Sequence, residues 1–196
     1  MQNMKQKIHL AILGSGNGTN AQRICEYFSE NECIDVCCII YNKKDAYIAE
    51  RAKNLGIDSQ YFNKHDFYDS DVVLQYLQEK QTDYVILAGF LLLVPENILQ
   101  AYPKRVINIH PALLPKYGGK GMYGHHVHQA VIDNHETESG ITIHIVDQHY
   151  DQGTTLFQAR CHVTPEDSAD TLADKIHLLE QEYFPVIIEK TVQKNA

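Results

Sequence analysis

Asn108 and His110 are the two side chains whose types and spacing could best support chemistry. They belong to an apolar run that reads as a strand, so both point to one face while Ile107 and Ile109 point to the other. A donor amide and a titratable imidazole thus emerge together where the strand ends, which is where open α/β sheets usually bind ligands. Such a pair can hydrogen-bond a carbonyl oxygen that gains negative charge and can move a proton. The alternative is that nearby backbone satisfies both polar groups. The proline that follows, Pro111, favours the functional interpretation.

Asp151 is a carboxylate that could support this imidazole. It stands shortly before Gly153, in a polar turn predicted over residues 147–154. Aspartates in such places are ordinary turn residues, and taken alone Asp151 is better interpreted in that way. Brought close to His110, however, the carboxylate would orient the imidazole and favour its protonated form.

A glycine-rich loop over residues 14–20 separates an apolar run from a stretch with helical spacing. Alternating glycines before a helix let backbone amides approach an anion such as a phosphate. The spacing is Gly-x-Gly-x-Gly, which fits neither the dinucleotide fingerprint nor the P-loop with its lysine. Asn17, Thr19 and Asn20 add side-chain donors. The loop alone is equally compatible with a tight turn that binds nothing.

Further polar residues stand in the C-terminal half. His177 and Glu180 are three residues apart on a predicted helix and therefore share a face. A solvated stripe is the commoner interpretation, and the alternative is that Glu180 holds an amine or hydroxyl of a substrate. His125, His126 and His128 have spacing that can bind zinc. No cysteine or carboxylate stands nearby at ligand spacing, so we expect no metal and a helix start that lines a polar cleft.

Strand and helix patterns alternate along the chain, which predicts an α/β fold with a doubly wound, mostly parallel Rossmann-like sheet. A C-terminal strand pair and a long helix complete it, and Pro185 is expected to kink or break that helix. An irregular loop spans 111–124. We expect one domain over 1–196, with a phosphate-binding half to 105 and a catalytic half over 106–196. The expected strands are 8–13, 34–41, 59–62, 84–88, 106–110, 141–145 and 155–163, and the expected helices are 21–28, 46–55, 73–80, 95–102, 125–134 and one from 168.

The composition limits the classes of function. The chain has 196 residues, 44% hydrophobic, with 17 Lys and Arg against 25 Asp and Glu and a net charge of −8. This balance argues against a broad nucleic-acid or membrane surface, yet it allows a small basic site for a phosphate. There is no apolar run of membrane-spanning length. The odd cysteine count without regular spacing predicts reduced thiols and a cytoplasmic location. The five cysteines are Cys25, Cys33, Cys37, Cys38 and Cys161.

The segment Asn108–Tyr117, with the sequence Asn-Ile-His-Pro-Ala-Leu-Leu-Pro-Lys-Tyr, resembles the core motif of the folate-dependent formyltransferases. The upstream Gly-Asn-Gly-Thr-Asn at 16–20 and Ala-Gly-Phe at 88–90 resemble the branch that acts on glycinamide ribonucleotide. The resemblance covers nearly the whole chain. The chain departs from many relatives at Gln152, where they carry glycine, at Leu92, where they carry a basic residue, and in its glycine-rich loop at 118–124.

This resemblance implies an enzyme of de novo purine biosynthesis that transfers a formyl group from 10-formyltetrahydrofolate to the amine of glycinamide ribonucleotide. It implies small-molecule substrates without metal, nucleic acid or membrane, in a monomer or homodimer. Asn108 and His110 would bind the formyl oxygen, and Asp151 would keep His110 protonated. The ribonucleotide would contact Gly18, Thr19, Asn20, His177 and Glu180. The folate would contact Phe90, Leu91, Leu92, Leu93, Val94, Asn108, Asp147, Tyr150 and Asp151.

Other functions fit less well. A methionyl-tRNA formyltransferase is expected to carry a further basic domain, and a formyltetrahydrofolate hydrolase is expected to carry a regulatory one. A sugar-nucleotide formyltransferase is harder to exclude on length. A regulatory nucleotide-binding module would leave Asn108, His110 and Asp151 without a role. A dehydrogenase would need a ribose-binding carboxylate where Tyr41 and Asn42 stand.

Overall fold

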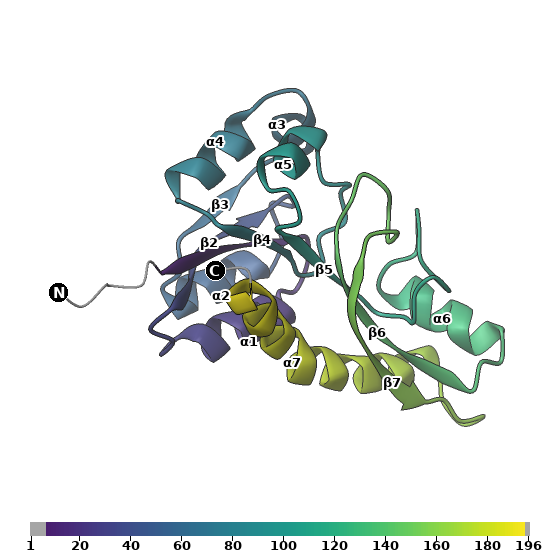
Figure 1. Cartoon of the computed structure of the whole chain (residues 1–196). Helices are drawn as coiled ribbons and strands as arrows, with labels where there is room; N and C mark the ends of the chain where they lie inside the picture. Colours follow the sequence, from purple (N-terminus) through teal and green to yellow (C-terminus); the bar gives the residue numbers. More distant parts are fainter. Residues whose placement is uncertain (1–6, 195–196) are drawn as a thin grey trace.

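The computed structural model describes residues 7–194 and contains one sheet of seven strands in the order β3-β2-β1-β4-β5-β6-β7 (Figure 1). The first five strands of this order are mutually parallel, whereas β6 pairs antiparallel with β5 and β7 pairs antiparallel with β6. The strands are β1 (Ile8–Gly14), β2 (Ile34–Tyr41), β3 (Ser59–Tyr61), β4 (Tyr84–Leu87), β5 (Val106–His110), β6 (Glu138–Ile145) and β7 (Thr155–His162). The predicted α/β class with a mostly parallel sheet and a C-terminal strand pair is confirmed.

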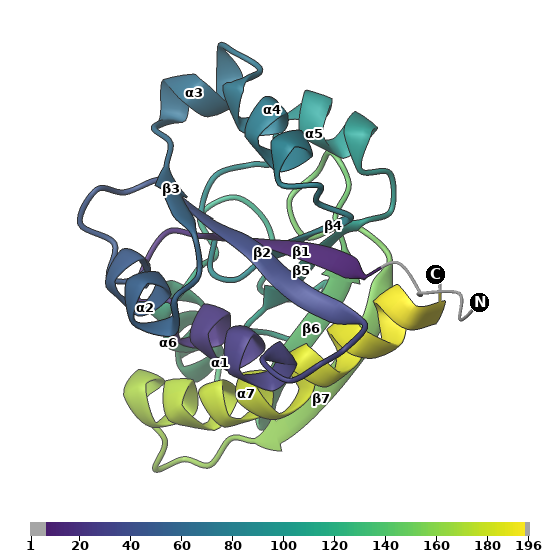
Figure 2. The same ribbon diagram turned by 90° about the vertical axis from the view of Figure 1, so that its left-hand side faces the viewer.

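Helices cover both faces of this sheet, and each face has its own apolar cluster (Figure 2). One cluster joins the sheet to α1, α2, α6 and α7, and the other joins it to α3, α4 and α5. The helices are α1 (Thr19–Phe28), α2 (Ile48–Leu55), α3 (Lys64–Tyr68), α4 (Val72–Glu79), α5 (Glu96–Ala101), α6 (His125–Asp133) and α7 (Ala169–Lys194). No helix within residues 7–194 has both the length and the hydropathy needed to cross a membrane.

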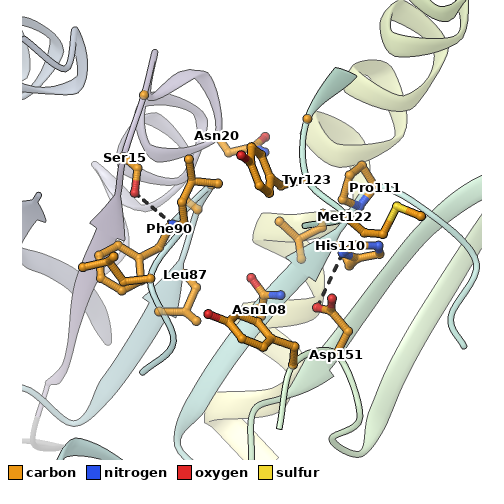
Figure 3. A pocket seen from close by; sticks show the side chains of 18 of the residues that line it. Ser15, Asn20, Leu87, Phe90, Asn108, His110, Pro111, Met122, Tyr123 and Asp151 are labelled. Atoms are coloured by element: carbon orange, nitrogen blue, oxygen red, sulfur yellow. Dashed lines mark hydrogen bonds and ion pairs between the residues drawn. The ribbon is translucent and has the colours of Figure 1, made fainter. Parts of the chain in front are cut away.

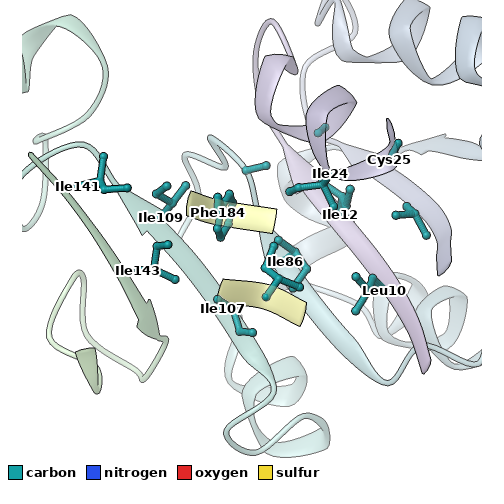
Figure 4. Close-up of a cluster of buried hydrophobic side chains, with 14 of the residues drawn as sticks. Leu10, Ile12, Ile24, Cys25, Ile86, Ile107, Ile109, Ile141, Ile143 and Phe184 are labelled. Atoms are coloured by element: carbon teal, nitrogen blue, oxygen red, sulfur yellow. The ribbon is translucent and has the colours of Figure 1, made fainter. Parts of the chain in front are cut away.

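Strand β5 separates its side chains as its sequence predicts. Ile107 and Ile109 lie in the cluster beneath α7, near Phe184 (Figure 4). Asn108 and His110 both line a cavity on the other side of the strand. Burial of the isoleucines therefore determines which way the two polar side chains point.

The structure differs from the sequence predictions at two places, since it contradicts a break at Pro185 and adds a short helix. The C-terminal helix is not broken at Pro185, because α7 continues from Ala169 to Lys194. Pro185 itself is buried, and the neighbouring Phe184 and Ile188 pack into the core, which offsets the backbone hydrogen bond that a proline removes. The short helix α3 was not expected. It depends on a capping box, in which the Asn63 side chain accepts two backbone N–H bonds, rather than on apolar periodicity.

Candidate active site

A cavity of about 720 Å³ lies at the carboxyl ends of β1, β4 and β5 (Figure 3). Parallel strands end at one edge of the sheet, so the loops that follow them converge there. The residues expected to act in catalysis and in ribonucleotide binding all line this cavity. Of those expected to bind folate, only Asp147 does not line it; its carboxylate accepts the His149 backbone N–H at 2.8 Å.

The glycine loop forms one end of the cavity and leads into α1. Gly18 is the residue before the helix and has φ 80°. A Cβ on it would lie 2.6 Å from the Ile48 side chain, so only glycine fits between the loop and α2. Ser15 connects the loop to the segment after β4. Its hydroxyl accepts the Leu91 N–H at 2.9 Å, and its own N–H donates to the Gly89 carbonyl. The helix N-terminus thereby faces the cavity.

Asn108 is oriented by His144, its neighbour on the antiparallel strand β6. The His144 Nδ1 lies 3.2 Å from the Ile145 carbonyl oxygen, which can only accept, so Nδ1 carries the proton. The other ring nitrogen, Nε2, then accepts from the Asn108 Nδ2 at 3.1 Å. Burial lowers the pKa of His144, which keeps this acceptor neutral. One N–H of the Asn108 amide is thus held by His144, and the second is left for a ligand.

His110 has an acceptor beside each of its ring nitrogens. Nε2 lies 2.8 Å from the Tyr117 carbonyl oxygen, and Nδ1 lies 3.5 Å from the Asp151 Oδ1. Since both partners accept, a doubly protonated ring satisfies both with donors. The His110 side chain is only 4% exposed and that of Asp151 12%, so little water screens the pair. The Asp151 contact is longer than a normal hydrogen bond, as is common before a substrate tightens a site.

Asp151 reaches His110 because the turn after β6 folds back sharply. Gly153 permits this, since a Cβ there would lie 1.7 Å from the Ile145 carbonyl oxygen. Asp151 itself adopts φ 56°, and its Oδ2 accepts the Gly119 N–H at 2.9 Å. Asp151 is a turn residue, as its sequence context predicts, but its position next to His110 is not that of an ordinary turn aspartate. The carboxylate is mostly buried and lies between the imidazoles of His110 and His144.

Glu180 is buried rather than part of a solvated stripe, with its side chain 7% exposed. Its Oε2 accepts from the Asn20 Nδ2 at 2.9 Å and lies 3.0 Å from the His177 Nδ1. The hydrogen bond to Glu180 raises the pKa of His177. Glu180 thus connects α7 to the first turn of α1, beside the glycine loop.

The segment 90–94 lines the wall of the cavity nearest α5 and is almost wholly apolar. Phe90 anchors it, because its ring packs against Phe67 with centroids 5.2 Å apart. Leu91 is 36% exposed, so an apolar surface faces the opening. Val146 and Tyr150, which follow β6, also line the cavity. The apolar surface of segment 90–94 suits one face of a flat ring system.

The histidines of α6 behave differently from one another. His128 is buried and lines the cavity, and burial lowers its pKa to about 4, so its imidazole is neutral near pH 7. His125 is exposed and pairs with Asp170 at 3.3 Å. Within the part of the chain that the structure describes, no cluster of three His, Cys, Asp or Glu residues could hold a metal ion.

Comparison with known proteins identifies a family and several named relatives. The family model described as formyl transferase matches residues 8–188. The chain belongs to the formyl transferase family. It is 39% identical over 194 residues to the chloroplastic phosphoribosylglycinamide formyltransferase of Arabidopsis thaliana, covering 94% of this chain and 66% of that protein. It is 32% identical to the phosphoribosylglycinamide formyltransferase of Haemophilus influenzae, covering 92% of this chain and 85% of that protein.

A solved structure extends the likeness to three dimensions. The crystal structure of phosphoribosylglycinamide formyltransferase from Bacillus halodurans superposes with a TM-score of 0.86 at 33% identity, covering 96% of this formyl transferase and 97% of that chain. The family resemblance inferred from the motifs at 108–117 and 16–20 is confirmed. His144 and Tyr117 are contributors to the site that the sequence reasoning missed. The alternation of His144 with buried isoleucines pointed to it, but only knowledge of its pairing with Asn108 would have revealed its role.

Proposed function

We propose that this formyl transferase moves the formyl group of 10-formyltetrahydrofolate to the amine of glycinamide ribonucleotide, as in purine biosynthesis. One observation carries the proposal. Asn108, His110 and Asp151 come together in a cavity that the glycine loop and the apolar segment 90–94 also line. The names of the Arabidopsis and Haemophilus relatives support the same activity.

The reaction needs stabilisation of an oxyanion and relay of a proton. The substrate amine attacks the formyl carbon, and the carbonyl oxygen becomes negative in the tetrahedral intermediate. The free Asn108 N–H donates to this oxygen, and the positive charge of a protonated His110, whose two N–H groups face Tyr117 and Asp151, stabilises it electrostatically. The amine then loses a proton and the folate nitrogen gains one as the carbon–nitrogen bond to the folate breaks. Asp151 holds the charge of His110 while this transfer proceeds.

Two parts of the cavity lining suit the two substrates. The glycine loop, with Gly18, Thr19 and Asn20, takes the ribonucleotide phosphate at the N-terminus of α1. Glu180, buried beside Asn20, takes an amine or hydroxyl of the same substrate. The apolar segment 90–94 and Tyr150 take the pterin. The amine and the formyl group then meet beside Asn108 and His110.

Features outside the cavity agree with this proposal. All five cysteines are free, as expected for a reducing compartment such as the cytoplasm, although the Arabidopsis relative is named chloroplastic. The formal charge of −8 suits small-molecule substrates better than a nucleic acid. The sugar-nucleotide and tRNA formyltransferases share the same catalytic chemistry, so the acceptor distinguishes them.

A turnover assay tests the proposal. The purified protein is mixed with 10-formyltetrahydrofolate and, in parallel reactions, with glycinamide ribonucleotide, an amino-sugar nucleotide or methionyl-tRNA. We expect deformylated folate to form only with glycinamide ribonucleotide. The His110→Asn variant serves as the inactive control. Absence of turnover by a folded protein, or a preference for another acceptor, would refute the assignment.

A further inference from the structure

Helix α2 lies directly behind the glycine loop and binds two successive carbonyl groups of it. The Ile48 N–H, in the first turn of α2, donates to the Gly16 carbonyl at 3.1 Å. One turn later, the Arg51 Nε donates to the Asn17 carbonyl at 2.8 Å. Both carbonyl groups therefore point toward α2.

This arrangement determines where the following N–H groups point. A trans peptide is planar, with its C=O and N–H on opposite sides. The N–H groups of Asn17 and Gly18 therefore point away from α2, and both residues line the cavity. In the described chain, these two N–H groups and that of Thr19 donate to no protein acceptor. Successive free N–H groups on one side of a loop form a concavity for an anion.

Arg51 holds the Asn17 residue by both of its oxygen atoms. Besides the backbone contact, its Nη2 lies 2.6 Å and its Nε 3.2 Å from the Asn17 Oδ1. The remaining nitrogen, Nη1, donates to the Gln22 side chain on α1, and the guanidinium lies 5.0 Å from the Tyr47 ring centroid. The planar guanidinium can make all of these contacts at once, whereas a lysine cannot.

We propose that Arg51 is a positioning residue for the phosphate of the ribonucleotide, an inference that rests on the proposed function. It turns the amides of Asn17 and Gly18 into the cavity and brings a positive charge to a loop that has none of its own. The loop lacks the lysine of a P-loop, and Arg51 of α2 provides a positive charge on the side of the loop that faces away from the cavity. Arg51 acts through Asn17 and contacts no reacting atom.

Binding of inorganic phosphate tests this inference without requiring turnover. The dissociation constant is measured by calorimetry for the wild type, Arg51→Gln and Arg51→Lys. Loss of the paired charge-assisted contacts to Asn17 is expected to weaken phosphate binding about tenfold in Arg51→Gln and less in Arg51→Lys. The matched control is Arg160→Gln, because Arg160 pairs with Glu138 across β6 and β7 and neither residue lines the cavity. Equal phosphate affinity in all four proteins would overturn the inference.

Kinetics then separate positioning from a general structural role. Glycinamide ribonucleotide is compared with the same compound lacking its 5′-phosphate. Arg51→Gln should raise the KM of the phosphorylated substrate about tenfold and leave the KM values of the dephosphorylated substrate and of the folate unchanged. An equal loss with both acceptors would show that Arg51 merely supports the fold. If Arg51→Gln binds phosphate more weakly than the wild type but the wild type does not turn over, the proposed function fails. The role of Arg51 in orienting the loop toward a phosphate then stands.

Discussion

Replacing Asp151 by Asn removes one charge while preserving the shape of the side chain. The amide oxygen can still accept the Gly119 N–H, which the carboxylate now accepts at 2.9 Å. What disappears is the attraction to a protonated His110, whose Nδ1 lies 3.5 Å from the Asp151 Oδ1. Two unit charges at that distance interact by about 5 kcal/mol at an effective dielectric constant of about 20.

This energy limits the expected loss of activity. Because each 1.4 kcal/mol corresponds to about a factor of ten in rate, the full interaction is equivalent to about 10³- to 10⁴-fold, and the 12% exposure of the Asp151 side chain reduces it. We therefore expect kcat to fall between about 10²- and 10³-fold. The KM values should change little, since Asp151 supports the imidazole more in the transition state than in the ground state.

The measurement is steady-state turnover with each substrate varied in turn. Asp133→Asn is the matched control, because Asp133 accepts a hydrogen bond from Gln129 on the surface of α6, away from the cavity. Urea unfolding confirms that both variants are folded. A fall in kcat of less than fivefold, or a loss seen only in KM, would refute the assigned role of Asp151.

Three further predictions concern other parts of the molecule. His144→Leu removes the acceptor that orients the Asn108 amide, so steady-state kinetics should show kcat about tenfold lower with both KM values within about twofold. The pKa of His128 is lowered to about 4, so between pH 6.5 and 4 the unfolded chain binds a proton that the folded chain does not. The free energy of unfolding therefore decreases as the pH is lowered through this range. From pH 6.5 to 4, the free energy of unfolding measured by urea titration should decrease by about 3 kcal/mol more in the wild type than in His128→Leu. Asp167 accepts from Lys175 and from the Thr164 backbone, which lowers its pKa, so its contribution is present above about pH 4 and is lost as pH falls. Asp167→Asn should therefore cost about 1–3 kcal/mol at pH 7 in chemical denaturation, and the difference from the wild type should shrink below about pH 4.

Strand β5 illustrates what can be predicted from sequence. The alternation of Ile107 and Ile109 with Asn108 and His110 is a property of one short segment, and burial of the isoleucines confirmed it. The motif that carries the family resemblance lies in the same segment and the loop after it. Local patterns of this kind are reliable because they do not depend on which strand lies next to them.

Local sequence patterns could not predict the positions of Asp151, Glu180 and Arg51 in the site. Glu180 looked like part of a solvated stripe because its helix carries many charged residues, yet packing of α7 against α1 buries it beside Asn20. Arg51 stood in an ordinary amphipathic helix, and only the contact of α2 with the glycine loop gives it a role.

The sequence by itself determined the strands, the helices other than α3, the face of β5 that carries Asn108 and His110, and the loop that precedes α1. Tertiary structure decided which of these meet. The antiparallel pairing of β6 with β5 places His144 beside Asn108, and the sharp turn after β6 returns Asp151 to His110. The physical reason is that side-chain alternation arises within a strand, whereas pairing and register depend on burial of the whole sheet between its two layers of helices.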